Sequence, residues 1–119
     1  MLTWLLARVR RASRWASRRV INALAHPRRV VVIEAEALPT EMPCHDLVLL
    51  MDCGEQWSVG MLCPCGCRDR LELPLIPEAK PRWSLSVDKR GRPTLHPSVW
   101  KRDGCKSHYF VRSGRIIWV

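Results

Sequence analysis

The hydrophobic pattern of the chain changes after residue 29, where short apolar runs broken by turns begin. Runs rich in β-branched residues, or alternating between apolar and polar positions, are typical of strands, and clusters containing Gly, Pro, Asp or Ser separate them. The expected strands span residues 30–35, 47–51, 57–62, 71–75, 83–87, 94–95, 109–111 and 115–119. The last two strands flank Ser113-Gly114 and predict a closing hairpin. We therefore expect a mainly β fold, a small antiparallel sheet or a partly open barrel.

Residues 2–25 have a different, helical periodicity, which Pro27 ends. One face is apolar and the opposite face carries arginines, although two further arginines lie near the apolar side. We divide the chain into a basic amphipathic helical arm, residues 1–29, and a β domain, residues 30–119. The arm either packs on its own domain or binds an acidic partner or an anionic membrane surface.

The charge of the chain is concentrated in this arm. The net charge is +9 over 119 residues, and residues 1–29 contribute eight arginines and no acid. The other ninety residues carry twelve Lys/Arg and eleven Asp/Glu, a balance of +1. A nearly neutral domain argues against nucleic-acid binding across its surface. The chain contains no stretch of about 18 apolar residues, so the sequence predicts no membrane-spanning helix.

Six cysteines in a small chain indicate either disulfides or a metal site. The apolar start, Leu2 to Leu6, is too short for a signal-peptide core, and arginines follow it directly. We therefore expect a cytoplasmic protein, whose arm is the one part that could contact a membrane surface. In a reducing cytosol, clustered cysteines are usually metal ligands.

Two clusters carry the metal-ligating residues. The ligand candidates are Cys63, Cys65, Cys67, Cys105 and His108. Zn²⁺ takes four such ligands in a tetrahedron, often as pairs from two loops, and Gly66 and Gly104 allow tight turns there. Five candidates compete for four places: either the four cysteines close the site and His108 is free for chemistry, or one cysteine is a spectator. Cys44 and Cys53 lie near apolar runs and are expected to be buried.

Ser98 and His108 form a candidate catalytic pair. A serine nucleophile needs a base within hydrogen-bond reach, and the loop containing Ser98 can fold back over the second cluster. Ser107 is a poorer nucleophile for this base because neighbours on a strand point to opposite faces. The rival scheme is an open zinc site that activates water with Glu72 as base, and turn formation is the ordinary role of such a serine.

The clusters and their surroundings resemble a bacterial domain-of-unknown-function family (the 6527 type). The resemblance covers roughly residues 30–119 and rests on Leu62–Cys67, Leu73–Leu75, Trp83, Gly91, Leu95–Ser98, Cys105–Tyr109 and Gly114–Trp118. It includes the CxCGC and CxSHY motifs. The arginine-rich helix lies outside it, and Arg68 stands where many members have glycine.

This family resemblance implies a pathway and its protein partners more firmly than it implies a reaction. Its members occur on phage-like elements and in operons for ubiquitin-like conjugation, which implies a role in antiphage defence. The implied partners are a ubiquitin-like modifier and its activating or conjugating enzymes. The leading hypothesis is a peptidase that processes or removes the modifier. The alternative is a non-catalytic, zinc-stabilised module that docks pathway proteins, or binds nucleic acid or membrane through its arm.

Overall fold

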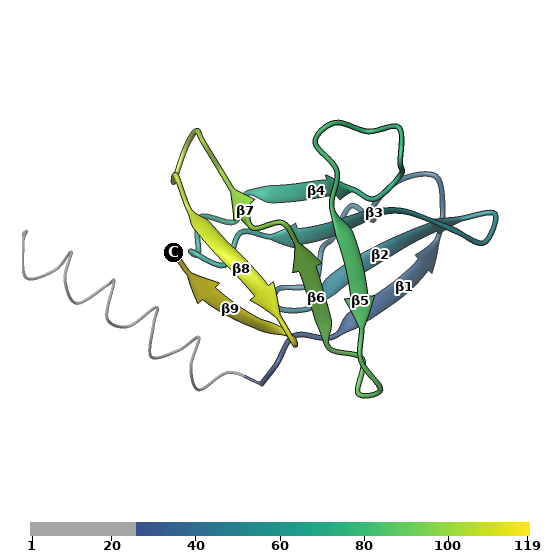
Figure 1. Cartoon of the computed structure of the whole chain (residues 1–119), viewed down its shortest axis with the longest axis horizontal. Helices are drawn as coiled ribbons and strands as arrows, with labels where there is room; N and C mark the ends of the chain where they lie inside the picture. Colours follow the sequence, from purple (N-terminus) through teal and green to yellow (C-terminus); the bar gives the residue numbers. More distant parts are fainter. Residues whose placement is uncertain (1–25) are drawn as a thin grey trace, which may run out of the picture.

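The computed structural model describes residues 26–119, which contain nine strands and no helix (Figure 1). The strands are β1 Val30–Glu34, β2 Leu47–Asp52, β3 Glu55–Leu62, β4 Arg70–Pro74, β5 Ser84–Val87, β6 Pro93–His96, β7 Val99–Trp100, β8 His108–Arg112 and β9 Arg115–Trp118. The expected helix over residues 2–25 lies outside the described residues. Among those described, no helix is long and apolar enough to cross a membrane. The expected mainly β fold is confirmed for this part of the chain.

The strands form three small sheets, and not the single sheet or barrel we expected. The first has the order β1-β2-β3-β4, the second is β5-β6, and the third is β7-β8-β9. β1 pairs with β2 in parallel, whereas every other pairing is antiparallel. A parallel pair needs a long crossover between its strands. Residues 35–46 supply that crossover here without a helix.

The crossover covers the outer face of the first sheet. A side chain at Gly60 in β3 would meet Leu38 and Met42 at less than 3 Å. Both faces of β2 are therefore covered, and its residues Leu47 to Leu50 are all buried. This explains why β2 is a continuous apolar run without alternation.

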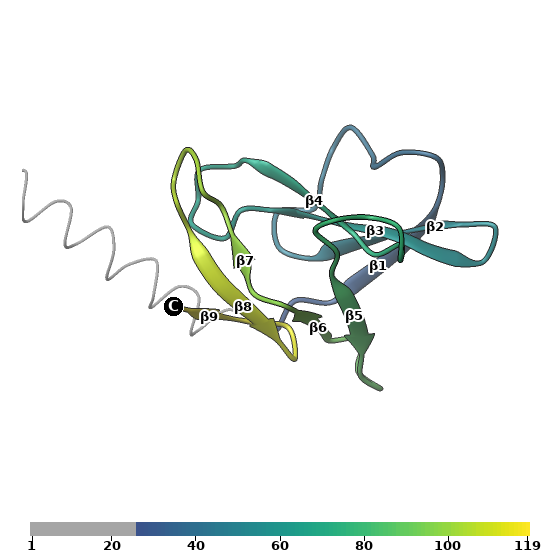
Figure 2. The ribbon, with the colours of Figure 1, turned by 45° about the horizontal axis from the view of Figure 1, so that its top comes forward.

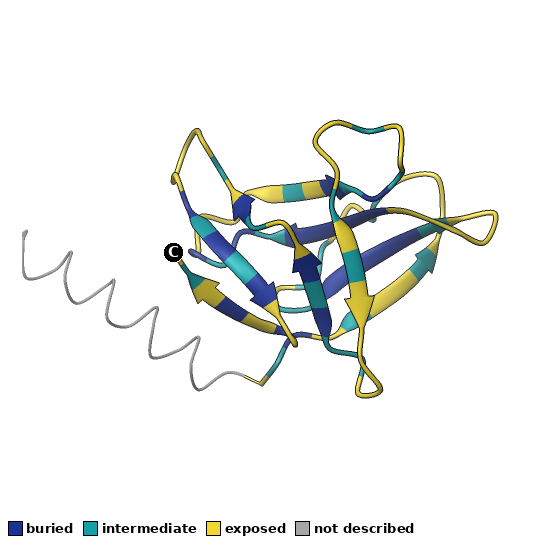
Figure 3. Ribbon diagram, in the orientation of Figure 1, coloured by how far each residue is buried: buried dark blue, intermediate teal, exposed yellow. Residues whose placement is uncertain are grey.

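The inner face of the first sheet packs against the other two sheets, which lie across it (Figures 1 and 2). Figure 3 shows buried residues in the strands of both layers, among them β2 and β3 in the first and β6 and β8 in the second. The core residues are Leu47, Leu49, Val59, Met61, Leu73 and Leu75 from the first layer with Leu95, Val99, Tyr109, Val111 and Ile116 from the second. Tyr109 is fully buried at the centre, and its hydroxyl contacts the Met61 sulfur at 3.6 Å. This two-layer core fixes β8, the strand that begins with His108.

Candidate functional site

Four cysteine side chains gather where the loop after β3 meets the loop between β7 and β8. The sulfur atoms of Cys63, Cys65, Cys67 and Cys105 all lie within 4.8 Å of one another. The Sγ of Cys63 lies 3.4 Å from that of Cys65 and 3.6 Å from that of Cys105. Residues more than forty positions apart thus form one cluster, as the sequence predicts.

These separations suit a metal site. Two sulfurs of a disulfide are about 2.0 Å apart, whereas sulfurs at the corners of a tetrahedron with ~2.3 Å zinc–sulfur bonds are about 3.8 Å apart. The four cysteines could therefore hold one metal ion, and four thiolates are a set that zinc accepts. His108 is not a member of this group. The geometry favours the ligand set of four cysteines, the alternative that leaves His108 free.

Tight turns bring the thiols together. Gly66 has φ +92° and Gly104 has φ +61°, in the left-handed region that glycine adopts without strain. The backbone N–H of Cys67 points at the Cys65 sulfur, 3.3 Å away. An ion pair between Lys101 and Asp69 joins the two cysteine loops. The cluster is thus assembled by its own turns and held by a charge pair between the loops.

The thiols differ in acidity. Burial raises the pKa of Cys63 to about 12. At Cys105 burial acts in the same direction, but hydrogen bonds from the Ser107 hydroxyl and backbone and from neighbouring thiols outweigh it and lower its pKa to about 6. The Ser107 hydroxyl lies 3.2 Å from the Cys105 sulfur. Ser107 therefore faces the cluster, which agrees with its expected orientation away from His108.

Ser98 and His108 form a direct contact beside the cluster. The Ser98 Oγ lies 2.9 Å from Nε2 of His108. Ser98 and His108 are both half-buried, so water and a substrate can reach them. The Ser98 carbonyl accepts a hydrogen bond from the Trp83 indole at 3.4 Å, which fixes the backbone beside the hydroxyl. The structure thus brings together the two residues that the sequence analysis proposed as a candidate catalytic pair.

The strand register explains this contact. Trp100 in β7 is paired with His108 in β8, and directly opposed residues share one face of a sheet. Ser98 precedes Trp100 by two positions and lies on the same face. It is therefore the diagonal neighbour of His108. β7 is only two residues long and lacks a sequence signal, so its pairing with β8 could not be predicted.

Trp100 and Arg102 complete the surroundings of His108. The Trp100 ring stacks on the His108 ring, with centroids 5.2 Å apart and planes at 15°. The Arg102 guanidinium lies over Trp100, 4.8 Å from the ring centroid. Trp100 is 54% exposed. Among the described residues no carboxylate is hydrogen-bonded to the His108 ring, so the pair is a dyad supported by an aromatic ring.

Several other expectations need correction. Cys44 and Cys53 are exposed and not buried, because they lie on a loop and a turn at the margin of the first sheet. Trp57 lies in a strand with apolar neighbours, which predicts a place in the core, but it is 42% exposed because the first residues of β3 are exposed. Glu72 accepts a hydrogen bond from the Ser58 hydroxyl at 2.9 Å. That contact engages Glu72 outside the thiol cluster and does not favour a role as base for a metal-bound water.

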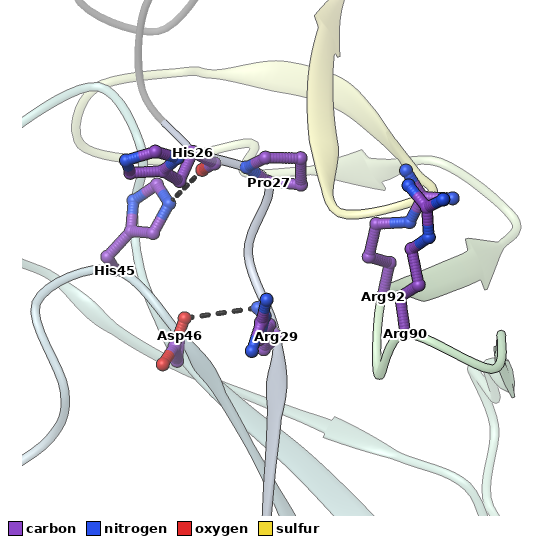
Figure 4. Close-up of a pocket in the computed structure, with 7 residues that line it drawn as sticks. All are labelled: His26, Pro27, Arg29, His45, Asp46, Arg90 and Arg92. Atoms are coloured by element: carbon purple, nitrogen blue, oxygen red, sulfur yellow. Dashed lines mark hydrogen bonds between the residues drawn. The ribbon is translucent and has the colours of Figure 1, made fainter.

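A separate cavity of about 480 Å³ lies at the other end of β6 (Figure 4). Its polar lining consists of His26, Arg29, His45, Asp46, Arg90 and Arg92. The backbone N–H of Arg29 donates to Asp46 at 3.0 Å, and the His45 ring is bonded to the carbonyl of His26. Three arginines and one aspartate line the cavity, and Arg92 is itself paired with Asp88 at 2.7 Å. The wall therefore keeps a modest excess of positive charge.

Comparison with known protein families shows the family to which the chain belongs. A family model described as bacterial ubiquitination-like system serine protease (BubE) matches residues 34–119. The chain belongs to this family. The match includes the four clustered cysteines, Ser98 and His108. No curated protein and no solved structure matches the chain.

Membership confirms the expected link to a bacterial ubiquitin-like system, and with it pathway proteins as the class of partner. The 6527 type, the particular partners, the role in antiphage defence and the cytoplasmic location stay predictions.

Proposed function

We propose that this protein is a serine peptidase that cleaves the peptide or isopeptide bond at the C-terminus of a ubiquitin-like modifier. The observation that carries the proposal is the 2.9 Å contact between the Ser98 Oγ and His108 Nε2. A nucleophilic serine needs a base at this distance. The family description as a serine protease of a ubiquitination-like system supports the same reaction and pathway.

The chemistry follows from the two side chains. With its own proton on Nδ1, His108 accepts the Ser98 proton at Nε2 while Oγ attacks the scissile carbonyl. His108 then gives this proton to the leaving amine, and an acyl-enzyme remains on Ser98. A water molecule, deprotonated by the same Nε2, then attacks the acyl carbonyl. The ester bond to Ser98 breaks, Oγ takes the proton back from Nε2, and the modifier leaves with a free carboxylate.

The thiol cluster has a structural role in this scheme. Four thiolates fill a tetrahedral zinc site and leave no position for a reactive water. Cys105 lies three residues before His108, so a bound zinc would fix the start of β8 and the imidazole with it. We propose Zn²⁺ as the resident metal and the bacterial cytoplasm, where thiols stay reduced, as the location.

The test is cleavage of a reporter fused to the C-terminus of a ubiquitin-like modifier from a bacterial system of this kind. We expect Ser98→Ala and His108→Ala each to lower kcat/KM by at least about a thousandfold. Ser86→Ala, which changes the same residue type at an exposed position away from the cavity, is the matched control. Unchanged cleavage by folded Ser98→Ala would refute the proposal.

A second function, docking of an acidic partner, is favoured by the cationic cavity. Arg29, Arg90 and Arg92 line it, and Arg29 belongs to the arginine-rich N-terminal segment. We propose that this end of the molecule binds an acidic protein of the pathway, with anionic membrane and nucleic acid as weaker alternatives. Such binding weakens with salt.

Charge reversal tests docking separately from catalysis. Arg90→Glu is expected to weaken binding of the modifier or its activating enzyme about fivefold or more at low salt, and to leave cleavage of a short peptide unchanged. Arg115→Glu, an equal charge change at an exposed position of β9, is the control. Equal effects of the two variants would contradict a docking role for the cavity.

A further inference from the structure

Strand β7 has one strand partner and one open edge. The third sheet has the order β7-β8-β9, so β8 is central and β7 has no neighbouring strand on its other side among residues 26–119. Open edges present backbone N–H and C=O groups that can pair with a further strand. Ser98 lies immediately before this strand.

The hydrogen-bond pattern identifies which backbone groups face the open edge. The Lys101 N–H donates to the Ser107 carbonyl at 2.8 Å, and the Val119 N–H donates to the His108 carbonyl at 3.0 Å. Because successive residues of a strand point their backbone groups to opposite sides, His108 faces β9 and not β7. Its partner Trp100 therefore turns both its N–H and its C=O toward the open edge.

Ser98 lies along the same edge. Its own carbonyl is bound by the Trp83 indole at 3.4 Å, so this position is occupied. Trp100 thus offers the first backbone donor and acceptor that a peptide approaching Ser98 would meet. The exposed Trp100 ring, with Arg102 over it, flanks this position on the face that carries the dyad.

We infer that the open edge of β7 binds the extended C-terminal tail of the substrate as an added strand, paired through the N–H and C=O of Trp100. Such pairing needs an extended backbone and leaves side chains outside the hydrogen bonds. This pairing selects a flexible tail over a folded segment. It also brings the carbonyl groups of the tail alongside Ser98. The inference rests on the proposed peptidase function and names how its substrate is held.

The test uses the unaltered enzyme and a set of tail peptides. Each peptide carries one backbone change, N-methylation or an ester in place of the amide, at successive residues before the scissile bond. A single Trp100 pair predicts one sensitive position, where both changes lower kcat/KM about fivefold or more. The same changes at the residues on either side, whose N–H groups point away, are the matched controls and alter kcat/KM less than about twofold.

The outcomes separate the two proposals. If the parent peptide is cleaved through Ser98 but all positions respond equally, or none responds, the strand pairing is refuted and the peptidase function stands. If the parent peptide and the full modifier fusion both resist the folded enzyme, the peptidase function itself fails. Loss of activity with rising enzyme concentration, accompanied by dimers in sedimentation, would instead assign the β7 edge to a second copy and overturn the inference.

Discussion

At the scale of single residues, His108 is held from two directions. Ser98 contacts its Nε2 at 2.9 Å, and Trp100 stacks on its ring at a centroid distance of 5.2 Å. An imidazole that serves as base must keep one nitrogen aimed at the nucleophile. We interpret Trp100 as a positioning residue that takes part of the role a carboxylate has in a triad.

Removal of the ring tests this interpretation. Trp100→Ala is expected to lower kcat about two- to tenfold with little change in KM, since a stacked aromatic pair contributes about 0.5–1.5 kcal/mol. Trp100→Phe retains a ring and should recover most of the rate. Trp57→Ala removes another exposed tryptophan, 42% exposed against 54% for Trp100, and is the control. A lowered rate that Phe does not restore would contradict stacking as the cause.

Arg68 is a second residue whose backbone matters. Its φ is +65°, in the left-handed region that costs a side-chain-bearing residue about 1–2 kcal/mol. The resemblance that the sequence suggests places glycine at this position in many members. Arg68→Gly is therefore expected to stabilise the protein by about 0.5–1 kcal/mol, the gain being reduced by the greater entropy of glycine in the unfolded chain. Urea unfolding measures this change in the free energy of unfolding. A destabilised variant would show that the Arg68 side chain stabilises the fold by more than its left-handed backbone conformation costs.

At the scale of elements, the two cysteine loops and β8 act as one unit. The Lys101–Asp69 ion pair and the shared thiols join them, and β8 carries His108. Metal binding to such a site contributes directly to folding free energy. The position of the dyad should therefore depend on the metal.

Metal loss tests this dependence. We expect one zinc per chain, and we expect Cys65→Ser to lose it, to lower the Tm by about 10 °C or more and to reduce cleavage at least about tenfold. Cys53→Ser, an exposed cysteine outside the cluster, should change neither metal content nor rate. Full metal occupancy and full cleavage in Cys65→Ser would exclude that residue from the ligand set.

The sequence predicts these elements unevenly, for physical reasons. The cysteine clusters were predictable because short local spacings, such as those from Cys63 to Cys67, themselves define half of a metal site. The contact of Ser98 with His108 could only be stated as a hypothesis. It depends on a two-residue strand, Val99–Trp100, whose register is set by the packed sheet and not by any local pattern.

At the scale of the whole molecule, the segment before β1 is joined to the last hairpin. The Arg28 N–H donates to the Gly114 carbonyl at 2.7 Å, and burial lowers the pKa of the Arg28 guanidinium. A Cβ at Gly114 would clash with the Arg28 carbonyl oxygen. Residues near the beginning and end of the described chain therefore close against each other. No sequence pattern indicated this contact, nor the parallel pairing of β1 with β2, because both are decided by how the layers stack.

Alanine substitutions at two glycines distinguish the free-energy cost of disturbing this contact from the cost of backbone strain. Gly114 and Gly54 both have φ +78°, but a Cβ at Gly54 meets nothing within 4 Å. Gly54→Ala should cost about 1–2 kcal/mol from conformation alone. Gly114→Ala should cost about 2–5 kcal/mol because the clash is added. Equal losses in urea unfolding would show that the contact between the segment and the hairpin contributes no stability.

The central claim is that His108 activates Ser98 as a nucleophile. Its most direct test is reaction of the zinc-loaded protein with a fluorophosphonate, followed by mass spectrometry of the peptides. The account predicts one adduct per chain, located on Ser98, absent in Ser98→Ala and slowed at least about a hundredfold in folded His108→Ala. Labelling of another residue, or equal labelling of Ser98 without the His108 imidazole, would contradict it.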